Sequence, residues 1–141
     1  MDPTDIATRV DGLLHEETQV SDRGVDLSLA TVEAVQEPGR VDFGGGELTN
    51  AALASVETAL RNPDDDYEWW NLDGGQYLIT YNERVTAGPP LVCEPRHALR
   101  ERGAFHPAIV VPPLGRVPLV VPDGGVRLKE NARISTLRQL G

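Results

Sequence analysis

The chain has 141 residues, 40% of them apolar, which suits one folded domain with its own core rather than a disordered tail. Its formal net charge of −9 argues against nucleic-acid binding, because a phosphate backbone would be repelled. No apolar run approaches the roughly 20 residues of a membrane-spanning helix, and the first residues lack the pattern of a signal peptide, so we expect a cytoplasmic protein.

The N-terminal segment is expected to form a short helix. Ile6, Val10 and Leu13 recur at helical spacing, and Thr4 is a plausible N-cap. From residue 25 onward the pattern changes to short β-like runs separated by Gly, Pro and Asp, which predicts a mainly β domain. The predicted strands cover residues 25–29, 31–36, 41–43, 76–81, 108–111, 116–121, 126–128 and 132–137.

One segment interrupts the strands. Residues 50–61 carry Leu53, Val56 and Leu60 at intervals of three and four, and Asn62 with Pro63 forms a stop signal. We interpret this segment as a helical insertion at about residues 48–62 of a single domain that spans residues 1–141. Just beyond it, Trp69 and Trp70 are adjacent on a predicted strand, so their side chains should face opposite sides of the sheet.

The basic residues are twelve arginines and one lysine, Lys129. Arginine is the residue suited to bidentate phosphate contacts. Lysine depletion together with an excess of acidic residues is also what a high-salt cytoplasm or a GC-rich genome would produce. These explanations all stay open. A high-salt cytoplasm predicts a fold whose stability depends on salt.

Four fragments in fixed order carry a resemblance to a known family. They are residues 24–29 (GVDLSL), 75–83 (GQYLITYNE), 95–99 (PRHAL) with Gly103 beyond, and 130–137 (ENARISTL). Together they resemble the dCTP deaminase/dUTPase superfamily, and most closely its archaeal-type dUTPase branch. The resemblance implies a dUTPase-like distorted antiparallel β-barrel with two or three short helices. It also implies a homotrimer with three sites at the subunit interfaces.

The resemblance also implies the roles of individual residues. Asp26 stands at the position of an aspartate that contributes to an Mg²⁺ site, so Mg²⁺ is the expected cofactor. The motif around Pro95 normally carries two serines, which are replaced here by His97 and Ala98, and the last motif has Thr136 in place of a glutamine. The positions implied to bind nucleotide phosphates are Arg96, His97, Ala98, Arg116 and Thr136.

Two residues that the family chemistry uses have no counterpart here. The aspartate that positions the attacking water in the hydrolases falls within residues 110–116 (VVPPLGR), where valine or proline stands instead. The glutamate of the deaminases would fall within residues 119–121 (LVV), so deamination is not expected. His106 is a candidate replacement base, and its alternative interpretation is a structural histidine.

The sequence therefore leads to two functional hypotheses. The first is a dUTP diphosphatase that converts dUTP to dUMP and pyrophosphate with Mg²⁺ in pyrimidine deoxynucleotide metabolism. The alternative is a divergent, catalytically impaired member of the superfamily that binds a deoxynucleoside triphosphate or has a regulatory role. A barrel with no nucleotide is a third hypothesis, and base preference cannot be read from residue identity.

Overall fold

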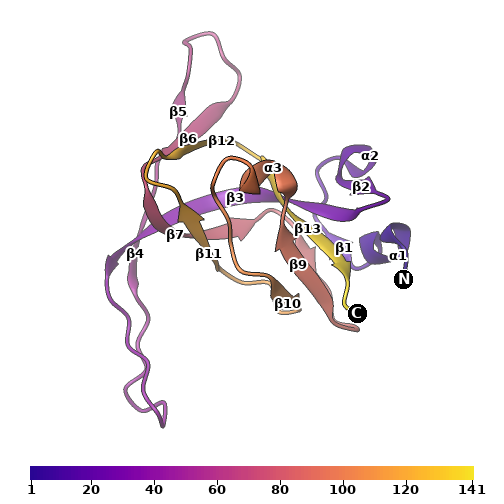
Figure 1. Ribbon diagram of the computed structural model, residues 1–141, viewed down its shortest axis with the longest axis horizontal. Coiled ribbons are helices and arrows are strands. Elements are labelled where there is room, and N and C mark those ends of the chain that lie inside the picture. The colour runs from indigo at the N-terminus through magenta and orange to yellow at the C-terminus, as the bar shows by residue number, and fades with distance from the viewer.

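The computed structural model describes all of residues 1–141 as a mainly β protein, with 46% of residues in strands and 9% in helices. Six strands form the path β10-β9-β13-β3-β7-β11, and β2 and β4 both pair with β3 off this path. The sheet curls strongly into an antiparallel half-barrel (Figure 1), which confirms the predicted fold class. The strands of this sheet are β2 (Val20–Ser21), β3 (Gly24–Glu37), β4 (Ala52–Ser55), β7 (Gly75–Tyr81), β9 (Leu91–Pro95), β10 (Ile109–Val111), β11 (Val117–Val121) and β13 (Arg133–Gln139).

Two smaller sheets complete the strand inventory. The first has the order β12-β6-β5, and the second joins β1 to β8. Their bounds are β12 (Val126–Lys129), β6 (Glu68–Leu72), β5 (Ala59–Leu60), β1 (Val10–Asp11) and β8 (Arg84–Val85).

The central strand β3 explains the curl of the main sheet. Its first half pairs with β13, from Val25 opposite Leu137 to Ser28 opposite Arg133, and its second half pairs with β7. Both ladders contain a register shift, and such bulges increase strand twist. Because β3 exchanges one partner for another along its length, it bends the two halves of the sheet around a common core.

The three helices are α1 (Pro3–Ala7), α2 (Glu16–Gln19) and α3 (His97–Arg100). The N-cap of α1 is Asp2, which accepts a hydrogen bond from the Asp5 amide, so the predicted Thr4 cap is wrong. The helix ends before Val10, because Val10 pairs with Val85 in the β1–β8 ladder. Each helix has only four or five residues, and none is long and apolar enough to cross a membrane.

The helix predicted over residues 50–61 is wrong. This segment holds β4 and β5, and Leu53 of β4 lies opposite Val35 of β3. The apolar positions spaced by three and four therefore belong to strands, because pairing with β3 satisfies the backbone of β4 within the sheet. The strand predicted over residues 41–43 is also wrong, because the only pairing in this region is one bridge from Arg40 to Thr49.

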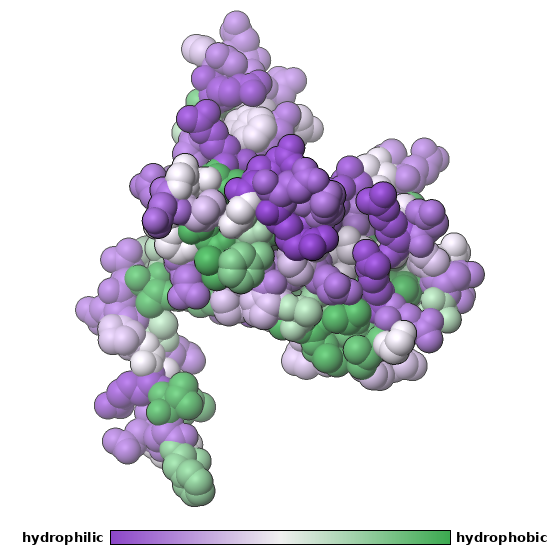
Figure 2. Space-filling model, viewed as in Figure 1, coloured by the Kyte–Doolittle hydropathy of each residue, from purple (hydrophilic) through white to green (hydrophobic).

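Residues 38–51 form an arm that projects from the body of the molecule between β3 and β4 (Figure 1). Asp42 accepts hydrogen bonds from the amides of Gly45 and Glu47 at the end of the arm. Phe43 is fully exposed there, and Figure 2 shows hydrophobic atoms at the tip of the arm.

The two adjacent tryptophans face opposite sides, as predicted. Trp70 is buried and its indole Nε1 donates to the Val56 carbonyl at 3.1 Å. Trp69 is half-buried and its ring lies beside the cationic groups of Arg61 and Lys129, at 5.3 and 5.7 Å from the ring centre.

Candidate functional site

Three neighbouring strands place one polar residue each in a single row. Thr136 of β13 lies directly opposite Asp26 of β3 on one side and Glu94 of β9 on the other. Residues that oppose each other across antiparallel strands project from the same face of the sheet. Asp26, Thr136 and Glu94 therefore point together to one side of the sheet, although they lie far apart in the sequence.

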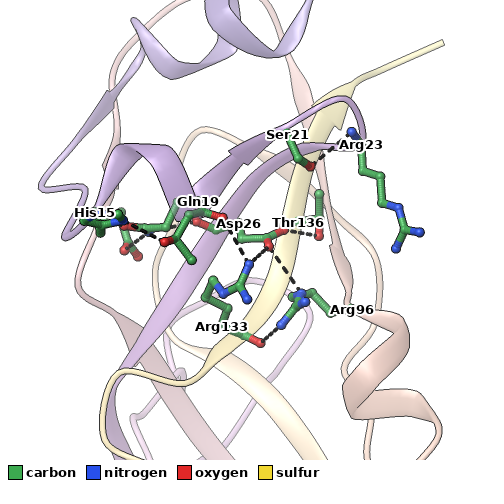
Figure 3. Close-up of polar contacts among 10 residues, drawn as sticks. His15, Gln19, Ser21, Arg23, Asp26, Arg96, Arg133 and Thr136 are labelled. Atoms are coloured by element: carbon green, nitrogen blue, oxygen red, sulfur yellow. Dashed lines mark hydrogen bonds and ion pairs between the residues drawn. The ribbon is translucent and has the colours of Figure 1, made fainter.

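Asp26 is the centre of a cluster of polar contacts (Figure 3). Its Oδ2 lies 3.0 Å from the Arg133 guanidinium and 3.3 Å from Nε of Arg96. Its Oδ1 accepts a hydrogen bond from the Thr136 hydroxyl at 2.8 Å. Arg96 also donates to the Arg133 carbonyl oxygen at 2.8 Å. Asp26 is only 7% exposed, so its carboxylate lies beneath the two guanidinium groups that it contacts and holds them in place.

This cluster forms the floor of a polar cleft with a volume of about 480 Å³. Its lining includes six arginines and four carboxylates, so the cleft carries an excess of positive charge on a protein whose net charge is −9. Figure 2 shows a strongly hydrophilic surface where α3 lies in Figure 1. The charged lining residues are Asp22, Arg23, Asp26, Glu94, Arg96, Arg100, Glu101, Arg102, Arg133 and Arg138. An acidic protein that concentrates arginines in one cleft has a site that favours anions.

Most of the residues implied by the resemblance meet in this cleft. Asp26, Arg96, His97, Ala98 and Thr136 all line it. The imidazole of His97 is exposed and pairs with the Glu101 carboxylate one helical turn further along. Ala98 contributes no polar side-chain group to the cleft, as expected for an alanine in place of the serine of the motif.

Arg116 lies outside the cleft. Arg116 directly precedes strand β11, on the other half of the sheet, and its Nε donates to the Glu33 carboxylate at 2.9 Å. Within one chain, the structure therefore does not bring Arg116 to the other residues predicted to bind phosphate.

His106 also lies outside the cleft, in the core. It is 2% exposed, and its two ring nitrogens contact the Pro107 carbonyl at 2.8 Å and the Ser135 hydroxyl at 2.7 Å. Ser135 in turn contacts the Tyr81 hydroxyl at 2.6 Å. Burial lowers the pKa of His106, which keeps the ring neutral. This placement corresponds to the structural interpretation of His106 and gives the ring no access to a substrate in the cleft.

The surroundings of Asp26 do not fit a directly bound Mg²⁺. Mg²⁺ is held by free oxygen ligands, usually one or two carboxylates with water. Both oxygens of Asp26 are engaged by Arg96, Arg133 and Thr136, and two guanidinium groups would repel a cation there. No group of three or more His, Cys, Asp or Glu residues in the chain is arranged to hold a metal ion. The implied role of Asp26 as a metal ligand is therefore replaced by a role as the anchor of two arginines.

The resemblance placed the site at a subunit interface, whereas the structure joins Asp26, Arg96 and Arg133 within one chain. Sequence reasoning also missed some of the cleft residues. Arg138 could have been found from strand alternation, because it lies two positions after Thr136. Arg100 could have been found from helix periodicity, because it lies four positions after Arg96. Glu94 and Arg23 carry no such signal, since only the pairing of distant strands brings them here.

A second cavity of about 860 Å³ adjoins the cleft. The two share Ala98, Arg102 and Arg133, so α3 and the start of β13 separate them. The second cavity is less polar, and its wall includes Trp69 and Leu72.

Comparison with known proteins identifies related sequences. No protein-family model matches the chain. Two curated relatives do match, both of them named probable deoxyuridine 5'-triphosphate nucleotidohydrolase. The relative from Methanosarcina acetivorans is 31% identical over 128 residues, which cover 86% of this chain and 71% of the relative. The relative from Methanococcoides burtonii is 30% identical over 97 residues, which cover 67% of this chain.

The chain spans about half of the Methanococcoides relative, 54% of its length. The match to the Methanosarcina relative extends over most of both proteins. This match, the curled antiparallel half-barrel and the four ordered fragments agree with one another. The chain therefore belongs to the deoxyuridine 5'-triphosphate nucleotidohydrolase (dUTPase) family.

Proposed function

We propose that the arginine cleft binds the triphosphate of dUTP and that the protein hydrolyses dUTP to dUMP and pyrophosphate. The observation that supports this proposal best is the pair of guanidinium groups, Arg96 and Arg133, held on the buried Asp26. Guanidinium groups bind phosphate oxygens in a bidentate manner. Groups that are already positioned stabilise developing negative charge without reorganisation during the reaction. The choice of dUTP follows the names of the two relatives.

Hydrolysis also requires a group that accepts a proton from the attacking water. We assign this role to Glu94, because it stands in the same row as Thr136 and Asp26 and remains 43% exposed. The one ion pair that Glu94 makes is with Arg138, at 3.9 Å. The other cleft acids are less suitable, since Asp26 is engaged by two arginines and Glu101 pairs with His97.

The proposed step is a displacement at the α-phosphorus. The water oxygen bonds to that phosphorus while Glu94 takes the water proton. The bond from the phosphorus to the oxygen that bridges it to the β-phosphate breaks, and pyrophosphate leaves with the electron pair. Arg96 and Arg133 hold the charge that accumulates on the phosphate oxygens.

A second candidate function is nucleotide binding without hydrolysis. The observation that favours it is the segment Val110–Arg116, where the family aspartate has no counterpart and no carboxylate replaces it. In this case the cleft would recognise a deoxynucleoside triphosphate and the protein would act through that binding alone.

Calorimetric titration with dUTP, combined with an assay of pyrophosphate release, separates the two candidates. Release that depends on Glu94 supports hydrolysis, and binding without release supports the second candidate. Arg96→Gln should weaken dUTP binding at least tenfold, whereas Arg84→Gln, an exposed arginine on β8 outside the cleft, should not change it. Wild-type protein that neither binds nor hydrolyses dUTP would refute both.

The same titration tests the role of metal. Because the cleft offers arginines rather than free carboxylates around Asp26, dUTP should still bind in the presence of EDTA. Loss of all binding on metal removal would show that the arginines do not hold the phosphates.

The homotrimer stays a prediction from the family resemblance. Because Asp26, Arg96 and Arg133 meet in one chain, anion binding should not require assembly. Analytical ultracentrifugation over a range of protein concentrations, with and without dUTP, would measure the oligomeric state and test both statements.

A further inference from the structure

Besides Arg102, which donates to the Ala98 carbonyl oxygen, three arginines of the cleft lie outside the cluster on Asp26. The side chains of Arg23 and Arg100 make no hydrogen bond or ion pair, and Figure 3 shows the Arg23 guanidinium without any contact. Arg138 has only the 3.9 Å contact with Glu94. These guanidinium groups are therefore available to a ligand, whereas Arg96 and Arg133 are already fixed by a carboxylate.

Arg138 and Arg23 stand beyond the inner pair in a defined direction. Arg138 lies two residues after Thr136 on β13, so it projects from the same face about 7 Å further along the strand. Arg23 lies in the turn between β2 and β3, and its amide donates to the Ser21 hydroxyl at 3.2 Å.

Gly24 fixes this turn against β13. A Cβ at Gly24 would lie 2.2 Å from the Leu137 carbonyl oxygen and 2.9 Å from the Thr136 side chain, so only glycine allows this approach. Since Val25 is paired with Leu137, the turn that carries Arg23 sits next to Arg138. Both residues line the same cleft as Arg96 and Arg133.

We propose that Arg23 and Arg138 form an outer anion subsite, distinct from the inner pair Arg96 and Arg133, that recognises the far phosphate of a linear polyphosphate. The inference rests on the proposed function in one respect only, namely that the cleft holds phosphates. A single phosphate reaches the inner pair alone, because the two subsites are separated along β13. A chain of phosphates spans both, so the outer subsite makes the protein selective for triphosphates over monophosphates.

The direct test uses inorganic ligands, which remove the nucleoside from the comparison. Orthophosphate, pyrophosphate and tripolyphosphate are titrated into wild-type protein at equal ionic strength, and the affinity should rise with the number of phosphates. The double variant Arg23→Gln/Arg138→Gln should bind tripolyphosphate at least tenfold more weakly, while its orthophosphate affinity changes less than twofold. Arg96→Gln should weaken the binding of both ligands.

The matched control is Arg40→Gln/Arg84→Gln, which removes the same amount of charge from exposed positions outside the cleft. This control should leave both affinities unchanged. Because Arg23 and Arg138 are exposed, the double variant should fold normally, which its melting temperature checks.

Three outcomes would overturn the inference. One is a double variant that keeps full tripolyphosphate affinity, and another is an equal loss for orthophosphate, which would indicate a general field effect. In both cases the proposed function is retained if the wild type binds tripolyphosphate and Arg96→Gln weakens that binding. Wild-type protein that binds none of the three ligands would refute the subsite and the proposed cleft function together.

Discussion

Two adjacent residues of β13 serve two different polar networks, one on each face of the strand. Thr136 points into the cleft and donates to Asp26, whose charge is balanced by Arg96 and Arg133. Ser135 points into the core, where it joins the hydroxyl of Tyr81 to the ring of His106.

The two networks differ in charge and in access to water. Burial raises the pKa of Tyr81 and of the nearby Cys93 thiol, the latter to about 11, and lowers the pKa of His106. Every member of the core network is therefore neutral at physiological pH. The cleft network is charged, and its arginine side chains are 26% and 35% exposed. The core network thus serves stability, whereas the cleft network holds charged groups where a ligand can reach them.

The largest effect should come from removing the core histidine. His106→Ala deletes a buried ring and leaves the Ser135 and Tyr81 hydroxyls with fewer partners, which should lower the free energy of unfolding by about 3 kcal/mol. Tripolyphosphate affinity of the folded protein should not change. Urea unfolding and calorimetric titration measure the two quantities.

His97 is the matched control, because it is exposed and lines the cleft. His97→Ala should change the free energy of unfolding by less than about 0.5 kcal/mol. If His106→Ala reduced ligand affinity without loss of stability, the division between the two networks would fail.

A smaller loss is expected when the anchor of the cleft is neutralised. Asp26→Asn removes the negative charge that balances the guanidinium groups of Arg96 and Arg133. The free energy of unfolding should fall by about 2 kcal/mol. The value lies below that of a fully buried pair because solvent screens the exposed arginines. Urea unfolding measures it.

An anion in the cleft should replace part of the lost charge. Tripolyphosphate should therefore raise the melting temperature of Asp26→Asn more than that of the wild type. Equal shifts in the two proteins would indicate that the anion does not contact the arginines that Asp26 holds.

The pH dependence of stability distinguishes the networks without mutation. The pKa of His106 is lower in the folded protein than in the unfolded chain, so the unfolded chain binds the proton more readily. This contribution to stability is complete above the unfolded pKa of about 6.5 and is lost as the pH falls below it. The loss should not exceed about 1.4 kcal/mol per pH unit.

Unfolding curves between pH 7.5 and 5, with the His106 ring signal followed by NMR, check this prediction. The ring signal should begin to titrate only below the pH at which the unfolded chain takes up its proton. A His106 signal that titrates with the unfolded chain would contradict a closed core network.

The smallest change is Thr136→Val, which keeps the shape of the side chain and removes the donor to Asp26. Its cost should be about 1 kcal/mol. Ser135→Ala, one residue away, should cost more because it strips a partner from both His106 and Tyr81 in the dry core. Equal effects at the two positions would mean that the two faces of β13 are not as different as their contacts indicate.

Residue patterns alone predicted a large part of the fold. The apolar runs of β3, β7, β10, β11, β12 and β13 were placed within a few residues, because alternation and β-branched content mark strands directly. The segment around Leu53 and Val56 was misassigned to a helix, since its spacing fits a helix and only the ladder between β4 and β3 decides otherwise.

The candidate site was predicted in part. The family resemblance identified Asp26, Arg96 and Thr136, but implied a metal ligand where the structure shows an anchor for two arginines. It also left His106 open as a base, and burial resolves that question. Arg23 and Glu94 could not be predicted, because strand β13, which lies beside both of them, is far from them in the sequence.

By itself the sequence determined that this is a small acidic β protein of the dUTPase family, because strand propensity and short motifs are properties of neighbouring residues. Which charged groups face one another was decided only by the tertiary structure. The pairing of β9, β13 and β3 places Glu94, Thr136 and Asp26 in one row and turns Ser135 to the opposite face. Electrostatic interactions depend on distance and on exposure to water, and neither quantity is set by position along the chain.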